Sequence, residues 1–122
     1  MIMRYEDLEV WKRADTLAHK VYDLTLTFPR RYALGLTSQL ERAVLSVPTN
    51  IVEGTASTHL AELLQSLNIS RRSLRETKYL LEFSLKRKLI KEDIFSELSN
   101  ECQIIEKMLN SLIRSLRNSK SK

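Results

Sequence analysis

An apolar stripe with the period of an α-helix runs straight through a proline in the first half of this chain. Its members recur at steps of three and four residues, the spacing of one buried helix face: Leu36, Leu40, Ala43, Val44, Val47 and Ile51. Pro48 lies inside the stripe, where a proline removes one backbone donor at a cost of roughly 3 kcal/mol. Polar side chains at Ser46, Thr49 and Asn50 are at hand to compensate. The pattern predicts one helix that continues through Pro48 with a kink.

Three other segments carry a helical period of their own. The first extends from about Glu6 to Phe28 and ends before Pro29, and another covers about His59 to Lys88. The last has a heptad seam: Leu98, Cys102, Ile105, Leu109, Leu112 and Leu116. Four amphipathic helices with short loops predict an all-α, antiparallel up-down-up-down four-helix bundle. We expect a single domain over residues 1–117 and a flexible basic tail at 118–122.

Residue types at the boundaries predict where the two middle helices begin and end. Thr37 or Ser38 is suited to cap the proline-containing helix, and Gly54 to end it in the left-handed conformation typical of a helix C-terminus. Ser57 or Thr58 is suited to cap the helix that follows.

Composition excludes several classes of protein. Two glycines and two prolines in 122 residues are too few for the turns of a β-sandwich or barrel. The first residues are too polar for a signal peptide, and no apolar run reaches membrane-spanning length. The lone Cys102 cannot form an internal disulfide, which suits a reducing compartment. We therefore expect a cytoplasmic protein with no membrane partner.

Residue patterns typical of catalysis or cofactor binding are absent. His19 and His59 lie on different predicted helices, and neither has a glutamate three residues before it, as a di-iron site in a bundle requires. Two glycines cannot build a glycine-rich phosphate loop, and Cys102 has no dedicated histidine partner. The sequence predicts a non-enzyme without catalytic residues, metal or cofactor.

Basic residues are more suggestive, with 20 Lys and Arg against 15 Asp and Glu. The candidate nucleic-acid-binding residues lie on one face of the third predicted helix and at its end: Arg71, Arg72, Arg75, Lys78, Lys86, Arg87 and Lys88. Arginine suits phosphate because its planar fork of donors matches phosphate oxygens. In the alternative reading these are solvated helix faces, their charge matched by Glu62, Glu76 or Glu82 nearby.

Two further sets of side chains allow more than one reading. Small hydroxyl residues form a file along one side of the third predicted helix: Ser66, Ser70, Ser73, Thr77 and Ser84. This hydroxyl file favours close packing against another helix, inside the bundle or between subunits, over a binding site lined by hydroxyl groups. Five aromatic residues are either base-stacking platforms or anchors of the core and of a subunit interface: Tyr5, Trp11, Tyr22, Tyr32 and Tyr79.

Five sequence blocks strongly resemble the four-helix bundle family named after proteins encoded in intervening sequences of 23S ribosomal RNA genes. They are Tyr5-Glu-Asp-Leu-Glu-Val-Trp11, Phe28-Pro29, Gly35-Leu-Thr-Ser-Gln39, Arg42-Ala43 and Ser46-Val-Pro-Thr-Asn-Ile-Val-Glu-Gly54. The likeness continues more loosely at 73–76 and 108–113 and spans nearly the whole chain. Val52 and Thr49 depart from the usual alanine and serine, and the segment 55–58 is less basic than in many relatives.

The resemblance implies an antiparallel four-helix subunit that assembles into a ring-shaped homopentamer. Accessory proteins of diversity-generating retroelements share this fold, are positively charged, and work with a reverse transcriptase and its RNA. The family supplies no catalytic residues to carry over. We expect a non-catalytic pentamer that binds RNA, DNA or a ribonucleoprotein through repeated basic surfaces. The alternative is a protein-only oligomeric scaffold or an accessory subunit, for example of a reverse transcriptase.

Overall fold

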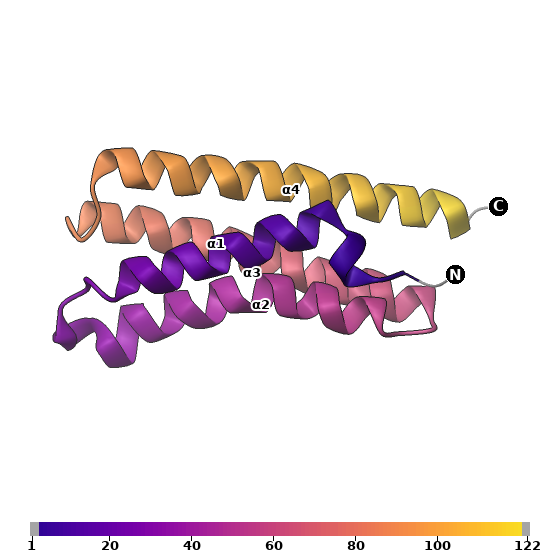
Figure 1. Ribbon diagram of the computed structural model, residues 1–122, viewed down its shortest axis with the longest axis horizontal. Coiled ribbons are helices and arrows are strands. Elements are labelled where there is room, and N and C mark those ends of the chain that lie inside the picture. The colour runs from indigo at the N-terminus through magenta and orange to yellow at the C-terminus, as the bar shows by residue number, and fades with distance from the viewer. Residues whose placement is uncertain (1–2, 121–122) are drawn as a thin grey trace.

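Four α-helices form most of the protein in the computed structural model, which describes residues 3–120. The helices are α1 Glu9–Thr25, α2 Ser38–Thr55, α3 Leu60–Lys86 and α4 Glu92–Lys120. They lie side by side along the long axis of the molecule (Figure 1). No strand occurs in the described part of the chain, so the predicted all-α four-helix bundle is confirmed. Residues 118–120 of the predicted tail continue α4, whereas 121–122 lie outside the described residues.

Figure 1 also shows which connections share an end of the bundle. The α1–α2 and α3–α4 connections lie at one end, whereas the α2–α3 connection, the start of α1 and the end of α4 lie toward the other. Hydrogen bonds join the two connections at the first end, because Arg87 donates to the hydroxyl of Tyr32. Segments far apart in sequence therefore build one surface there.

α1 is shorter than the helix that the sequence predicts from Glu6 to Phe28. Leu8 adopts an extended conformation (φ −86°, ψ 121°), which separates a 3-10 turn at Tyr5–Asp7 from α1. The helix ends at Thr25, already before Pro29, so the proline does not itself terminate it. Apolar residues continue at helical spacing beyond both ends of α1, and the predicted helix was therefore too long.

α2 continues through Pro48, as predicted. Side chains one turn further along bond the carbonyl groups that precede the proline. Thr49 Oγ1 donates to the Leu45 carbonyl and Asn50 Nδ2 donates to the Ser46 carbonyl, both at 2.8 Å. These bonds add donors in the turn where the proline removes one. The carbonyl whose donor Pro48 removes is that of Val44, four residues back, and neither bond reaches it. Continuation of the helix is therefore confirmed, whereas compensation by polar neighbours and the kink stay predictions.

The hydroxyl file of α3 serves helix packing inside the bundle. Ser70 is fully buried, and its Oγ donates to the Val47 carbonyl of α2 at 2.8 Å. Ser73 Oγ donates to Ser46 Oγ at 2.9 Å, a second bond between the same two helices. Thr77 instead donates to the Ser73 carbonyl of its own helix. The reading as close packing within the subunit is therefore confirmed.

Gly54 brings α2 close to α3. The sequence predicts that this glycine ends α2 in the left-handed conformation, and this prediction is wrong. The helix continues to Thr55, and no glycine in the described chain has a positive φ. A Cβ at position 54 would lie 2.9 Å from Ser66 Cβ and 3.1 Å from Leu63 Cδ1. The missing side chain is what permits this approach.

The start of each middle helix also differs from the predicted caps. Thr37 occupies the predicted N-cap position of α2 but makes no side-chain capping bond, because the helix follows directly on a 3-10 turn at Arg30–Tyr32 and a π-helical turn at Ala33–Thr37. The N-cap of α3 is His59, whose backbone is extended. Ser57 lies just outside the helix, where its Oγ accepts a hydrogen bond from the His59 N–H at 3.0 Å.

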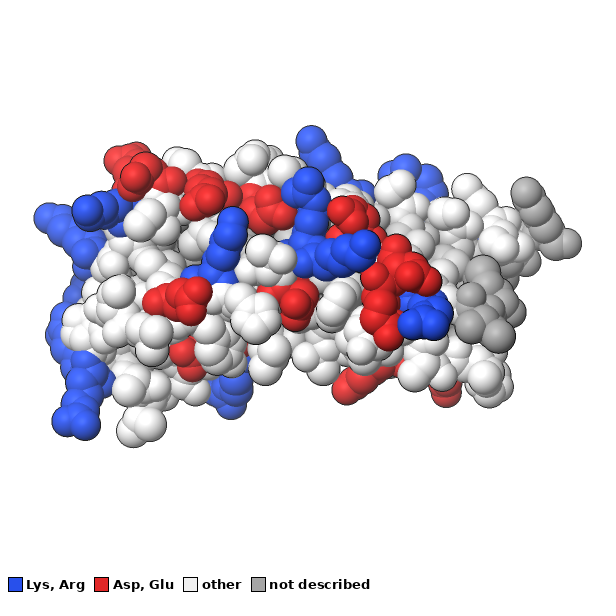
Figure 2. All heavy atoms as spheres, viewed as in Figure 1, with Lys and Arg blue, Asp and Glu red and all other residues white. Residues whose placement is uncertain are grey.

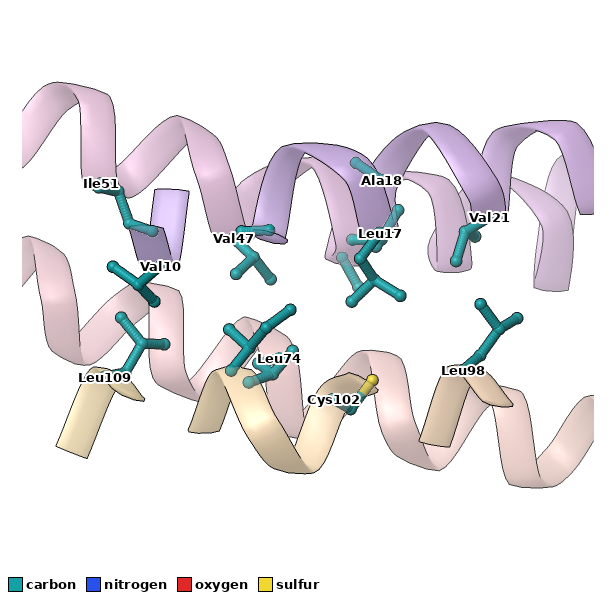
Figure 3. Packing of buried hydrophobic residues seen from close by; sticks show 14 of the residues in the cluster. Val10, Leu17, Ala18, Val21, Val47, Ile51, Leu74, Leu98, Cys102 and Leu109 are labelled. Atoms are coloured by element: carbon teal, nitrogen blue, oxygen red, sulfur yellow. The ribbon is translucent and has the colours of Figure 1, made fainter. Parts of the chain in front are cut away.

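The hydrophobic core lies between the helices, and each of them contributes residues to it (Figure 3). Five of the six predicted seam residues of α4 are buried: Leu98, Cys102, Ile105, Leu109 and Leu116. Leu112 is only partly buried but packs against the core, and Ile113, 2% exposed, is buried beside it. A straight α-helix drifts by about 20° per heptad from a strict 3.5-residue repeat, so a residue next to a seam position can also face the core. The predicted seam is therefore confirmed, but the heptad pattern did not include Ile113.

α3 ends in a backbone motif that places Lys88 in the left-handed region. Its φ of 63° is the only positive value at a non-glycine residue in the described chain. The Leu89 N–H donates to the Ser84 carbonyl and the Lys88 N–H to the Leu85 carbonyl, both at 2.9 Å. These are the two bonds of a Schellman motif, with Arg87 as the C-cap. The helix therefore ends earlier than the predicted boundary at Lys88.

Replacement of Lys88 by glycine is expected to raise the free energy of unfolding by about 0.5–1 kcal/mol. Glycine occupies the left-handed region without the steric cost that other residues incur. Urea denaturation of the two proteins measures the difference. Lys86→Gly, in the last turn of the helix, is the matched control and should lower the stability instead. A Lys88→Gly protein less stable than the parent would contradict the assignment of strain to this position.

Candidate nucleic-acid interface

The basic face predicted on α3 borders an open groove between α3 and α4. The central part of this groove is lined by residues of both helices: Arg71, Arg72, Arg75, Glu106 and Asn110. Three of the seven predicted nucleic-acid-binding residues are therefore together in one place. They face α4 because steps of three and four residues return to the same side of a helix.

Two of these arginines already have polar partners. The Arg71 guanidinium donates to Asn110 Oδ1 at 3.0 Å across the groove and to Asn68 Oδ1 at 2.9 Å. Arg75 lies 3.7 Å from Glu106, with its own side chain 82% exposed. The alternative prediction, that a glutamate pairs with these arginines, is therefore right for Arg75, but the glutamate is not one of the three named from the sequence. The partner is Glu106 of α4, which residue spacing along α3 could not reveal.

Lys78 lines the adjoining part of the groove, together with Tyr79 and Cys102. The Cys102 thiol is buried, and burial raises its pKa to about 12. The charge of Lys78 lowers the pKa of this thiol but does not offset the burial. The thiol is therefore protonated at neutral pH, and a protonated thiol is a poor nucleophile.

A second group of cations covers the end of the bundle where the α1–α2 and α3–α4 connections lie. Figure 2 shows Lys and Arg side chains gathered over this end, whereas basic and acidic side chains are mixed over much of the remaining face. We term this surface the basic end. It consists of six exposed residues: Arg30, Arg31, Lys86, Arg87, Lys88 and Lys91.

The positive charge of the basic end is not paired with carboxylates. Within residues 3–120, no ion pair involves any of its six members. Glu92 and Asp93 follow closely in sequence, but they occupy the first turn of α4, where the helix dipole stabilises a carboxylate. Asp93 Oδ1 also accepts the Ile94 N–H at 2.9 Å. The basic end is therefore the stronger candidate for binding an anion.

The structure divides the predicted binding residues between these two surfaces. The set from Arg71 to Lys78 lies along the middle of α3, whereas the set from Lys86 to Lys88 lies at the basic end. The predicted binding residues do not include Arg30 and Arg31, which follow Pro29 in the loop between the first two predicted helices. In an antiparallel bundle the α1–α2 connection lies at the same end as the α3–α4 connection. The Arg-Arg pair in the α1–α2 connection could therefore have been assigned to the same surface as Lys86, Arg87 and Lys88.

The aromatic residues divide in a similar way. Tyr5 and Trp11 pack edge to face, with ring centroids 4.8 Å apart, against the core. They are anchors within the subunit. Tyr79 is 59% exposed and lies beside Phe83, which is 40% exposed. Tyr32 belongs to the α1–α2 connection and lies at the basic end, where two arginines contact it.

Each of the two histidines lies near a single carboxylate on the surface of the bundle. His19 lies 3.8 Å from Asp15, and His59 lies 3.7 Å from Glu62. Among the described residues, no three His, Cys, Asp or Glu side chains are grouped so that they could hold a metal ion. Within the same residues, no helix combines the length and apolar character that crossing a membrane requires.

Known proteins resemble this chain in sequence and in fold. Residues 6–111 match the model of a family described as 23S rRNA-intervening sequence protein. The fold is similar to that of a protein of unknown function from the S23 ribosomal protein family of Bacteroides thetaiotaomicron VPI-5482, with a TM-score of 0.79 and 23% identity. The similarity covers 86% of this chain and 95% of that one. No curated protein shows significant sequence similarity to the chain.

Proposed function

We propose a function from the premise that this chain belongs to the family of 23S rRNA-intervening sequence proteins. It is a non-catalytic, cytoplasmic helical bundle that forms a homopentamer and binds nucleic acid, or a ribonucleoprotein, through repeated basic surfaces. The observation that carries the proposal is the basic end, where six exposed cations gather without an ion pair among the described residues. Cations of this kind bind phosphates and release the counterions that screen them.

Self-assembly of the subunit is supported by its exposed apolar side chains. Six large apolar residues are at least one third exposed: Tyr22, Leu26, Leu34, Leu45, Tyr79 and Phe83. Exposed apolar side chains that lie together are typical of an interface with another protein, and Tyr79 lies beside Phe83 on α3. A ring would repeat the basic end in every subunit and so strengthen its positive potential. Light scattering should give the mass of five subunits, whereas the mass of a monomer would contradict the assembly.

Charge reversal separates the two basic surfaces. We expect Lys86→Glu with Lys88→Glu to remove most of the binding of a fluorescein-labelled single-stranded RNA, measured by fluorescence anisotropy. The matched variant Arg71→Glu with Arg75→Glu should lose less, because Arg71 and Arg75 are already engaged by Asn68, Asn110 and Glu106. Circular dichroism and light scattering verify that both variants keep the fold and the assembly of the parent.

The same experiment tests the proposal against its alternative. A parent protein that does not bind the RNA at low salt would overturn nucleic-acid binding. The function would then be that of a protein-only scaffold or accessory subunit, with a reverse transcriptase as one partner to test. If both charge-reversal variants lose the same amount of RNA affinity, the prediction that the basic end binds RNA more strongly than the α3–α4 groove would be contradicted.

A further inference from the structure

Two guanidinium groups converge on one phenol oxygen at the basic end. Tyr32, in the 3-10 turn between α1 and α2, accepts a hydrogen bond from Arg31 Nη2 at 2.8 Å. Arg87, at the end of α3, donates to the same oxygen from Nε and Nη2, each at 3.4 Å. The Arg31 guanidinium also lies over the Tyr32 ring, 4.7 Å from its centroid. Side chains from both connections are thereby held at one point.

This arrangement holds like charges around a neutral acceptor. Three N–H groups share one oxygen, and the two bonds from Arg87 are long for N–H···O bonds. Within the described residues, neither Arg31 nor Arg87 has a carboxylate partner. The hydrogen bond from Arg87 lowers the pKa of Tyr32, and the charges of both arginines act in the same direction. The surroundings thus favour a negative charge at this point.

We propose that Arg31 and Arg87 together bind one phosphate group of a nucleic-acid backbone, while Tyr32 holds the two guanidinium groups in place. This inference rests on the proposed function and assigns it to a defined pair of residues. A phosphodiester presents two unesterified oxygens, which accept hydrogen bonds from planar guanidinium forks better than one phenol oxygen does. Arg30 and Lys88 are the chain neighbours of these arginines and extend the positive surface toward adjacent phosphates.

The test compares variants in their binding of a short fluorescein-labelled oligouridylate across a salt series. Arg31→Ala with Arg87→Ala should lower the affinity by about 10- to 100-fold at low salt, as expected for the loss of charge-assisted hydrogen bonds. The slope of log K against log salt should become shallower by about 0.7, the value for one phosphate contact on a single strand. Lys12→Ala with Lys107→Ala removes the same charge from exposed positions outside the basic end and should change neither quantity.

Variants that conserve charge separate a defined site from a diffuse basic surface. Arg31→Lys with Arg87→Lys keeps the net charge but removes both forks, and Tyr32→Phe removes only the shared acceptor. Both should weaken binding, the lysine pair more than the phenylalanine. Lysine variants that bind as tightly as the parent would overturn the phosphate site.

The outcomes distinguish this inference from the function on which it rests. If the parent binds RNA and the double alanine variant binds it as tightly as the Lys12, Lys107 control, the phosphate site alone is overturned. If the parent does not bind RNA at all, the proposed function fails, and the site fails with it. Circular dichroism shows that each variant is folded, as the exposed positions of Arg31 and Arg87 lead us to expect.

Discussion

Truncation of Ile105 to alanine is expected to lower the free energy of unfolding by about 2–5 kcal/mol. Ile105 is 0% exposed and lies in the middle of the buried seam of α4. The loss combines the transfer of the removed methyl and methylene groups to water with the cavity that remains. Urea denaturation followed by circular dichroism measures it.

The neighbouring Ile104 supplies the matched control, because it has the same side chain but is only partly buried. Ile104→Ala should therefore lower the stability by clearly less than Ile105→Ala. Equal losses, or an Ile105→Ala protein as stable as the parent, would show that α4 does not present this face to the core.

Substitution of Gly54 by alanine is expected to lower the free energy of unfolding by about 1–3 kcal/mol, although alanine by itself favours a helix. The added Cβ would lie 2.9 Å from Ser66 Cβ, an atom fixed directly to the backbone of α3. The two helices must move apart to admit it, and the hydrogen bond from Ser70 to the Val47 carbonyl would be strained. Urea denaturation again measures the change.

Gly35→Ala is the control for this substitution. A Cβ at Gly35 would meet no atom within 4 Å, so alanine there should leave the stability unchanged or raise it slightly. A Gly54→Ala protein that gains stability as Gly35→Ala does would contradict the close packing of α2 on α3.

Most of the fold could be predicted because its signals are local. Apolar residues at steps of three and four define each helix, and the stripe on both sides of Pro48 correctly indicated one continuous helix. The errors arise where a local signal has two explanations. Gly54 suits a helix end and also a close helix contact, and only the position of Ser66 on α3 decides between them. A strict heptad includes Leu112 but not Ile113, which a straight helix also turns toward the core.

The candidate site was harder to predict because it depends on contacts between distant segments. Lys86, Arg87 and Lys88 are recognisable as a basic cluster in the sequence. The contact of Arg87 with Tyr32 follows only from the fold, which places two connections at one end. The pairing of Arg75 with an acid of α4 is likewise a property of the packed helices.

The most direct test of the central claim is the affinity of the unmodified protein for single-stranded RNA as a function of salt. If the basic end binds the phosphate backbone, log K should fall linearly with log salt, with a slope of about −0.7 for each phosphate contacted. Fluorescence anisotropy at several salt concentrations gives this slope. Absence of binding at low salt, or an affinity that does not change with salt, would contradict the account.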